Sequence, residues 1–297
     1  MIKRTLYFGS PAKLATKDNQ LIIQRDNERN VRIPIEDIGF IILDHYAISI
    51  SKTLLSRCVE NNTAILTADD KHMPNAWFMP LEGNAVQQKH FRIQMKAGVP
   101  LKKRLWKQTI LAKIKNQSDL LKSQSIPDKY LIENAKKVKS GDPGNIEGRV
   151  ARYYWQRLFN PFSFKRERFG GPPNNLLNYG YAILRAVIAR AIVGSGLLPS
   201  LGIHHKSQYN PFPLADDIME PYRPMVDELV LNMVLAEDDY LDLTPETKKT
   251  LLQLPVMDVK MGKNKKPLMI AASSTTSSLV RCFMGEDKKI IYPTLCH

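Results

Sequence analysis

Hydrophobic and polar positions follow two different periods along this chain, and the change lies near residue 80. Before it, apolar side chains alternate with polar ones or form short runs between turn residues, as is typical of strands. The predicted strands are 13–16, 20–24, 30–35, 38–43, 64–67 and 75–79. The run 38–43 is apolar throughout, so we expect a strand buried on both faces. Ser51 is expected to cap one short helix.

After residue 84 the apolar positions recur with helical spacing. The predicted helices are 85–97, 101–121, 146–159, 176–193, 218–235 and 245–254. The Ser/Thr tract 273–278 fits a final helix or a loop equally well. Together these patterns predict an α+β protein with a small N-terminal β domain at 1–80, a linker at 81–84 and a larger all-α domain at 85–297.

The composition is that of a globular protein, because 43% of the 297 residues are hydrophobic and 24% are charged. No apolar run reaches the roughly 18–20 residues that span a bilayer, and the N-terminus lacks the apolar stretch of a signal peptide. Cys58, Cys282 and Cys296 are too few and too far apart for a disulfide framework or a cysteine zinc site. We therefore expect a soluble protein of the cell interior.

Positive charge is concentrated in the middle third of the chain. Residues 86–200 carry 22 basic and 6 acidic side chains, whereas 1–85 carry 10 of each and 201–297 carry 11 basic and 13 acidic. A basic zone of this size indicates a polyanionic partner. Nucleic acid is favoured over a membrane surface, because no stretch pairs the charge with a clean apolar face. The simpler alternative is a solvated basic surface.

A short basic loop within this zone is the candidate DNA contact. Lys165, Arg166 and Arg168 lie between Pro161-Phe162 and Gly170-Gly171. Basic side chains held in such a loop can contact phosphates. A plain solvated loop explains the same pattern.

Acidic and imidazole side chains in the helical part are the candidates for chemistry. Glu147 begins a predicted helix and shares the stripe of its apolar positions, so it should point inward. His204 and His205 follow one another after a glycine. Asp217 and Glu220 are three residues apart, so on one helix they should face the same way.

Two carboxylates and one imidazole form a ligand set that suits Mg²⁺ or Mn²⁺, whereas zinc favours more histidine or cysteine. A divalent ion beside a basic zone implies phosphodiester chemistry. Each part also has a simpler interpretation: Glu147 could pair with Arg149 or Arg152, and the acidic residues of 216–220 could complement a helix dipole. Spacing alone does not bring Glu147 to His205.

No protein nucleophile stands out in the sequence. The segment 194–196 lacks the strand-to-helix context of a phosphate loop, no Gly-x-Ser-x-Gly elbow occurs, and no cysteine has a nearby histidine base. Eleven tyrosines leave a tyrosine recombinase open, but nothing places one among the arginines and histidines that such an enzyme needs.

Four motifs occur in order along the chain: NIEGRVARYYW at 145–155, PNNLLNYGYAIL at 173–184, GIHH at 202–205 and LADDIMEPYRP at 214–224. In this order they resemble the motifs of one family, the CRISPR-associated spacer-acquisition integrase and endonuclease, numbered one among the Cas proteins. The resemblance extends over essentially the whole chain. The stretch 210–224 is most similar to the type II branch.

The resemblance implies a catalytic metal site made of Glu147, His205 and Glu220, with Asp217 as an auxiliary acidic residue. The family pattern places its histidine three residues after a glycine, which selects His205 over His204. Mg²⁺ or Mn²⁺ is the implied cofactor. The implied attacking group is the 3′-hydroxyl of the incoming DNA, so no protein nucleophile is needed.

The implied function is insertion of short foreign DNA fragments, the spacers, into a CRISPR repeat array. Residues 85–297 would carry catalysis and DNA binding, and 1–80 would form the homodimer contact. Two such dimers would flank one dimer of a small partner protein in a hetero-hexamer. Double-stranded DNA is the substrate, the RNA-guided effector nuclease is a further candidate partner, no membrane is involved, and the expected location is the prokaryotic cytoplasm.

Two other functions stay open on the sequence alone. A stand-alone metal-dependent nuclease acting on branched or single-stranded DNA would cleave DNA without joining it. A non-enzymatic DNA-binding scaffold would bind DNA equally well with and without a divalent ion.

Overall fold

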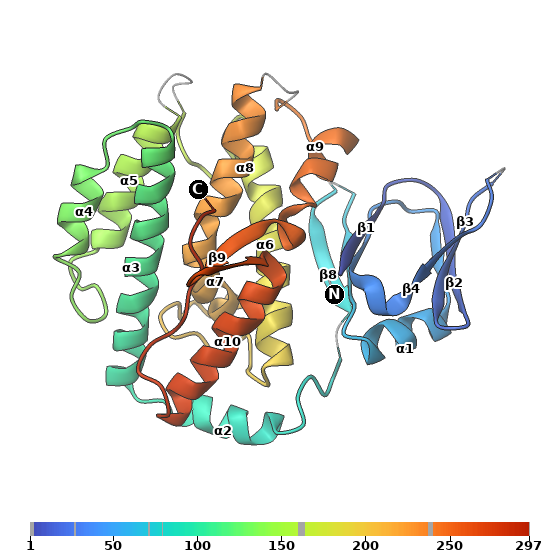
Figure 1. Ribbon diagram of the computed structural model, residues 1–297, viewed down its shortest axis with the longest axis horizontal. Coiled ribbons are helices and arrows are strands. Elements are labelled where there is room, and N and C mark those ends of the chain that lie inside the picture. The colour runs from blue at the N-terminus through green and yellow to red at the C-terminus, as the bar shows by residue number, and fades with distance from the viewer. Residues whose placement is uncertain are drawn as a thin grey trace.

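The computed structural model describes residues 3–26, 28–70, 72–78, 80–159, 164–236 and 240–296 (Figure 1). Its N-terminal part is β-rich, as predicted, and the described residues there include one α-helix and a short 3₁₀ helix at Ile35–Asp37. The elements are β1 (Arg4–Phe8), β2 (Ala12–Lys17), β3 (Gln20–Gln24), β4 (Val31–Pro34), β5 (Ile38–Leu43), β6 (Ile48–Ile50), α1 (Lys52–Glu60), β7 (Ala64–Ala68) and β8 (Pro74–Phe78). The strands form two four-stranded sheets, ordered β1-β5-β7-β8 and β4-β3-β2-β6.

Strand β5 joins the β-rich part to the rest of the protein. It pairs in parallel with β1 and β7 and is buried along nearly its whole length, which confirms the prediction from its apolar run. Phe40 and Ile42 belong to the hydrophobic cluster that continues among the helices. Ile38 and Ile41 belong to the separate cluster enclosed by the two sheets and α1. The first sheet is therefore covered on both faces.

The remainder of the chain is mostly helical. It contains α2 (Gln87–Lys96), α3 (Val99–Ser123), α4 (Lys129–Ala135), α5 (Ile146–Leu158), α6 (Asn174–Gly194), α7 (Pro213–Met219), α8 (Arg223–Leu235), α9 (Pro245–Leu251), β9 (Asp258–Met261), β10 (Asn264–Pro267) and α10 (Leu268–Met284). Helix α3 packs against α4 and α5, and α6 packs against α7, α8 and α10 (Figure 1). The α+β fold class predicted from the sequence is confirmed.

Helix α6 is long and apolar enough to cross a membrane by its length and mean hydropathy, although Arg185 and Arg190 interrupt its apolar residues. However, 72% of its apolar window is buried inside the protein. Its contacts with three other helices explain this burial. Among the described residues α6 is the one helix of this kind, and its packing is that of a core helix.

The predicted helix 218–235 is divided in the structure. Helix α7 ends at Met219, a 3₁₀ turn follows at Glu220–Tyr222, and α8 begins at Arg223. Pro221 and Pro224 cause the division, because proline lacks the backbone N–H that a continuous helix needs. This break places Glu220 in a tight turn rather than on a regular helix face.

Other differences concern short elements. The pattern did not predict β1, β6 or α4, and the C-terminal part is not all-α, because β9 and β10 form a hairpin around Gly262. The Ser/Thr tract lies in α10, where the buried hydroxyls of Thr276 and Ser278 donate to backbone carbonyls. Met79, the end of one predicted strand, lies outside the described residues, and the boundary at 81–84 stays a prediction.

A buried ion pair also fastens α9 to the first sheet. Nζ of Lys248 lies 3.0 Å from Oδ2 of Asp44, and the two side chains are 4% and 2% exposed. We expect Lys248→Met to lower the free energy of unfolding by about 3 kcal/mol, because the buried carboxylate of Asp44 would lose its buried cation and keep its contacts with Tyr7 and the partly exposed His72. Denaturant unfolding measures the loss, and Lys249→Met, at the exposed neighbour, is the control. Equal losses in the two variants would contradict this account.

Candidate functional site

Glu147 is positioned by a capped helix start. Asn145 precedes α5 in a left-handed conformation with φ of 47°, and its side chain accepts a hydrogen bond from the N–H of Gly148. The carboxylate of Asp142 accepts bonds from the N–H groups of Ile146 and Glu147, both at 3.0 Å. These bonds satisfy backbone donors that a helix start leaves free. The first turn of α5, which carries the Glu147 side chain, is therefore held in a defined conformation.

Glu220 lies in the tight turn between α7 and α8, and its side chain is 10% exposed. Its Oε1 accepts from Nε of Arg223 at 2.8 Å, and its Oε2 accepts from Nζ of Lys113 at 2.5 Å. Burial alone would raise the pKa of this carboxyl, but the charges of Arg223 and Lys113 outweigh it and lower the pKa to about 2. Glu220 is therefore ionised at neutral pH.

A lysine that the sequence analysis missed brings the two glutamates together. Lys113 projects from α3, and its Nζ donates to Oε1 of Glu147 as well as to Glu220. Burial would lower the pKa of this ammonium, but the charges of Glu220 and Glu147 outweigh it and raise the pKa. A signal existed in the sequence: Lys113 follows Trp106 and Ile110 by seven and three residues, which places it on their stripe.

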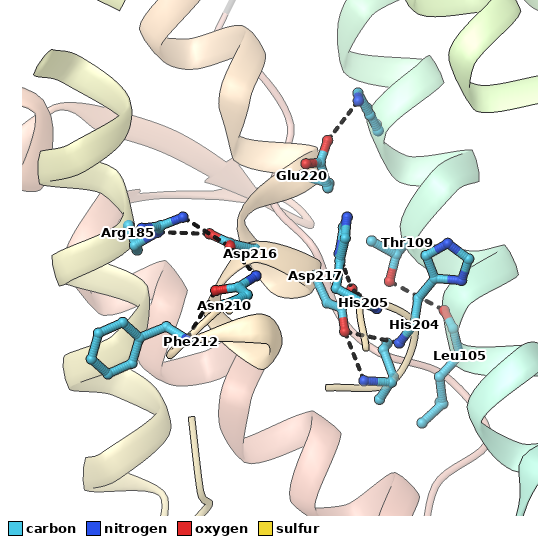
Figure 2. Close-up of polar contacts among 12 residues, drawn as sticks. Leu105, Thr109, Arg185, His204, His205, Asn210, Phe212, Asp216, Asp217 and Glu220 are labelled. Atoms are coloured by element: carbon cyan, nitrogen blue, oxygen red, sulfur yellow. Dashed lines mark hydrogen bonds and ion pairs between the residues drawn. The ribbon is translucent and has the colours of Figure 1, made fainter. Parts of the chain in front are cut away.

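Asp217 organises the loop that carries the two histidines (Figure 2). Its buried carboxylate accepts from the N–H groups of Ile203, His204 and His205, at 2.7, 2.9 and 3.2 Å. It also lies 2.6 Å from Nδ1 of the His205 ring. Glycine is needed at position 202, because a Cβ there would lie 2.6 Å from the carbonyl oxygen of His205 and 2.9 Å from Oδ2 of Asp217.

The two imidazoles have different surroundings. The ring of His204 stacks on Trp106, with centroids 4.1 Å apart and an interplanar angle of 2°, and burial lowers its pKa. The hydrogen bond to Asp217 raises the pKa of His205. When His205 is neutral, an ionised Asp217 keeps the hydrogen on Nδ1, so Nε2 retains the lone pair that a metal ligand needs. This arrangement supports His205 as the ligand, which stays a prediction.

The donor chemistry of these residues fits a divalent ion. Two carboxylates already share one cation, the ammonium of Lys113, and the charge of Glu220 contributes to the raised pKa of His205. Within the described ranges, however, no three His, Cys, Asp or Glu side chains form a group that could hold a metal as it stands. A metal at Glu147 and Glu220 would take the place that the ammonium now holds.

The simpler interpretation of Glu147 names the wrong partners. Glu147 pairs with Lys113, whereas Arg149 and Arg152 lie on the exposed side of α5. The Glu147 side chain is 28% exposed, so it is turned only partly inward. Sequence distance explains the error, since the true partner lies 34 residues earlier in the chain, on α3.

The acidic residues at the end of α7 also have separate partners. Asp216 pairs with Arg185 of α6, with Nε 2.7 Å from Oδ1, so it does more than complement a helix dipole (Figure 2). Asp217 meets the histidine loop, whereas Glu220 meets α3. The expectation that Asp217 and Glu220 face the same way is therefore wrong, because the helix tightens between them.

The predicted DNA-contact loop is only partly free. The guanidinium of Arg166 donates to Oδ1 of Asn174 at 2.8 Å and to Oδ1 of Asn178 at 2.7 Å, so it holds the loop against α6. We therefore expect a structural role for Arg166 instead of a DNA contact. Lys165 and Arg168 are exposed and stay predicted contacts. The Pro-Phe pair before the loop lies outside the described residues.

Comparison with known proteins gives consistent matches. The family model described as CRISPR associated protein Cas1 matches residues 6–253. The CRISPR-associated endonuclease Cas1 of Neisseria meningitidis serogroup C is 34% identical over 284 residues, which cover 94% of this chain and 91% of the relative.

Solved structures share the fold at lower identity. A casposase bound to integration product has a TM-score of 0.78 at 17% identity, covering 98% of this chain and 93% of its own. A chain of the Cas6-RT-Cas1–Cas2 complex has a TM-score of 0.74 at 21% identity, covering 98% of this chain and 36% of its own. The family model and the Neisseria relative span most of the sequence, and on this ground the chain belongs to the Cas1 family of CRISPR-associated proteins.

Proposed function

We propose that this protein is a metal-dependent DNA endonuclease and integrase that inserts short foreign DNA fragments into a CRISPR repeat array. The observation that carries the proposal is the meeting of Glu147 and Glu220 on one cation. Membership of the Cas1 family supports the DNA chemistry, since the Neisseria relative bears the name of an endonuclease. The 210–224 stretch favours the type II branch.

The protein side chains would hold and orient the reacting groups. Bound by Glu147, Glu220 and Nε2 of His205, Mg²⁺ or Mn²⁺ would polarise a phosphoryl oxygen and stabilise charge on the attacking and leaving oxygens. The charge of Arg223 keeps Glu220 ionised, and the contact with Asp217 would keep the hydrogen of a neutral His205 on Nδ1. In strand transfer, the donor 3′-oxygen would form a new P–O bond while the bond from that phosphorus to the 3′-oxygen of the repeat strand breaks. The donor hydroxyl would lose a proton to water, and the leaving 3′-oxygen would gain one, so protons and charge balance. With water as the attacking group, the same site hydrolyses DNA.

Two further candidates are separated by one experiment. Wild-type protein is incubated with a DNA donor that has a free 3′-hydroxyl and with a repeat target, with and without Mn²⁺. We expect joined product only with the metal. Cleaved but unjoined DNA would indicate a stand-alone nuclease on branched or single-stranded DNA. Equal binding in both conditions without any DNA change would indicate a non-enzymatic scaffold.

The proposed assembly is a homodimer that joins a small partner protein. We place the dimer contact in residues 1–80, where β4 is a sheet edge and Val31 and Tyr46 are 46% and 96% exposed. The Cas1–Cas2 complex among the structures of similar fold supports a small partner protein. We further propose two dimers around one partner dimer, contact with the RNA-guided effector nuclease, and a cytoplasmic location.

DNA affinity should fall steeply with salt, with a log–log slope of about −0.9 per neutralised phosphate. Lys165→Ala with Arg168→Ala should reduce the magnitude of the slope by about 0.9 for each phosphate that the variant no longer neutralises, for any DNA sequence. Arg166→Ala should instead lower the melting temperature, because Oδ1 of Asn178 loses the Arg166 donor and Oδ1 of Asn174 keeps the N–H of Glu167 alone of its two donors. Fluorescence anisotropy over a salt series measures the slope. A flat slope for the wild type would remove the DNA-binding proposal.

A further inference from the structure

Lys113 is a buried cation that the proposed chemistry does not use. The residue is 7% exposed and lies on α3 among the buried side chains of Ile110, Ile114 and Gln117. An isolated ammonium in such a place is costly, and its two carboxylate partners offset that cost. Those partners are Glu147 and Glu220, the two glutamates that we propose as metal ligands.

The two carboxylates depend on Lys113 to different degrees. Glu220 has a second cationic partner, because Arg223 binds its other oxygen at 2.8 Å. For Glu147, the hydrogen bond found for the carboxylate among the described residues is the one from Lys113. Without Lys113, Glu220 would still be paired with Arg223, whereas the negative charge of Glu147 would lie near Glu220 with no cation between them. The ammonium therefore keeps these two like charges together.

A divalent ion and this ammonium compete for the same oxygens. A metal at the two carboxylates beside an unmoved Lys113 would bring two cations together in a partly buried site, where repulsion is strong. We propose that Lys113 is a resident cation, which occupies the site between Glu147 and Glu220 in the metal-free protein and withdraws when the divalent ion binds. This inference rests on the metal site of the proposed function.

Lys113→Met tests the competition, and Lys115→Met is the matched control. Lys115 lies two residues along the same helix, about 200° around the axis, and pairs with Asp119 on the exposed side. We expect Lys113→Met to melt at a lower temperature than the wild type in EDTA. We also expect it to bind Mn²⁺ about tenfold more tightly in calorimetric titration, because the competing charge is gone. The control should change neither quantity.

Amine labelling of the wild-type protein gives a second measurement that does not depend on a variant's folding. Mass spectrometry after brief labelling, with and without Mn²⁺, should show at least a twofold rise at Lys113 when the metal is present and no change at Lys115. Unchanged labelling at Lys113, or equal Mn²⁺ affinity in wild type and Lys113→Met, overturns the resident-cation proposal and leaves the metal site standing. Absence of Mn²⁺ binding in both proteins overturns the metal site and this inference with it.

Discussion

Glu147→Gln is expected to slow strand transfer by at least about a thousandfold, which corresponds to about 4 kcal/mol of lost transition-state stabilisation. Glutamine keeps the shape of the side chain but removes the negative charge that a divalent ion requires. The fold should survive, because Glu147 is 28% exposed and the caps of its helix come from other residues. The measurement is the rate of joined product from a 3′-hydroxyl donor and a repeat target in Mn²⁺.

Two further variants show whether the loss of strand-transfer activity in Glu147→Gln is specific to the proposed metal site. Glu133→Gln removes an exposed carboxylate from α4 and should leave the rate unchanged. Glu220→Gln should lose activity as Glu147→Gln does and should also lower stability, because Arg223 and Lys113 would lose a buried partner. DNA affinity without metal should be unchanged in Glu147→Gln. A wild-type rate in the folded Glu147→Gln variant would exclude Glu147 from the site.

The fold was predictable where burial leaves a periodic pattern. The apolar run of β5 and the stripe of α3 identify elements whose environment is uniform along their length. Strand β1 was not predicted because four of its five residues are exposed or only partly buried, so it has no clear apolar pattern. Its pairing with β5 also connects residues more than thirty positions apart. The β9–β10 hairpin was not predicted because its second strand, Asn264–Pro267, is lysine-rich and shows no alternation of apolar and polar residues.

The candidate site was predictable through ordered motifs and not through spacing. Local pattern gave Glu147 a helix start and an inward direction, but it offered Arg149 or Arg152 as partners, because these lie on the same helix. The observed partner, Lys113, belongs to another helix, and only tertiary packing brings it there. Similarly, Pro221 breaks the helix that would have aligned Asp217 with Glu220.

The distribution of charge along the sequence likewise does not show which basic side chains are free to contact DNA. The basic excess of 86–200 is a property of the sequence, but the role of each cation depends on its neighbours. Arg166 is bound by two asparagines, and Lys113 is bound by two glutamates, so neither is free to meet a phosphate. A net charge thus indicates the class of partner and does not identify the contacts.

His205→Ala is expected to lower strand transfer by about a thousandfold or more, whereas His204→Ala should keep activity within about tenfold of the wild type. The adjacent rings differ in their partners: His205 is bound to Asp217, and His204 stacks on Trp106. Loss of that stacking should cost His204→Ala about 1 kcal/mol of stability. Both variants are assayed for joined product and for unfolding. Equal inactivity with intact folding would leave no reason to prefer His205.

The pH dependence of metal binding also tests whether His205 is a metal ligand. The hydrogen bond to Asp217 raises the pKa of His205 in the folded protein above its pKa in the unfolded chain. The protonated His205–Asp217 pair therefore stabilises the fold fully below the unfolded-state pKa, and this stabilisation is lost as the pH rises through the higher folded-state pKa. A metal ligand must be neutral, so Mn²⁺ binding has to displace this proton. Mn²⁺ affinity should therefore fall as the pH falls through the raised pKa, beginning above the ordinary histidine value of about 6.5.

Asp217→Asn removes the charge that raises the pKa of His205, so the fall in Mn²⁺ affinity should move to lower pH. His205→Ala should remove this part of the pH dependence, whereas His204→Ala should retain it. Calorimetric titration with Mn²⁺ between about pH 5.5 and 8 measures the three variants against the wild type, a range that brackets ordinary histidine titration. An unchanged pH profile in His205→Ala would mean that this imidazole does not ligate the metal, because no proton would then have to leave it.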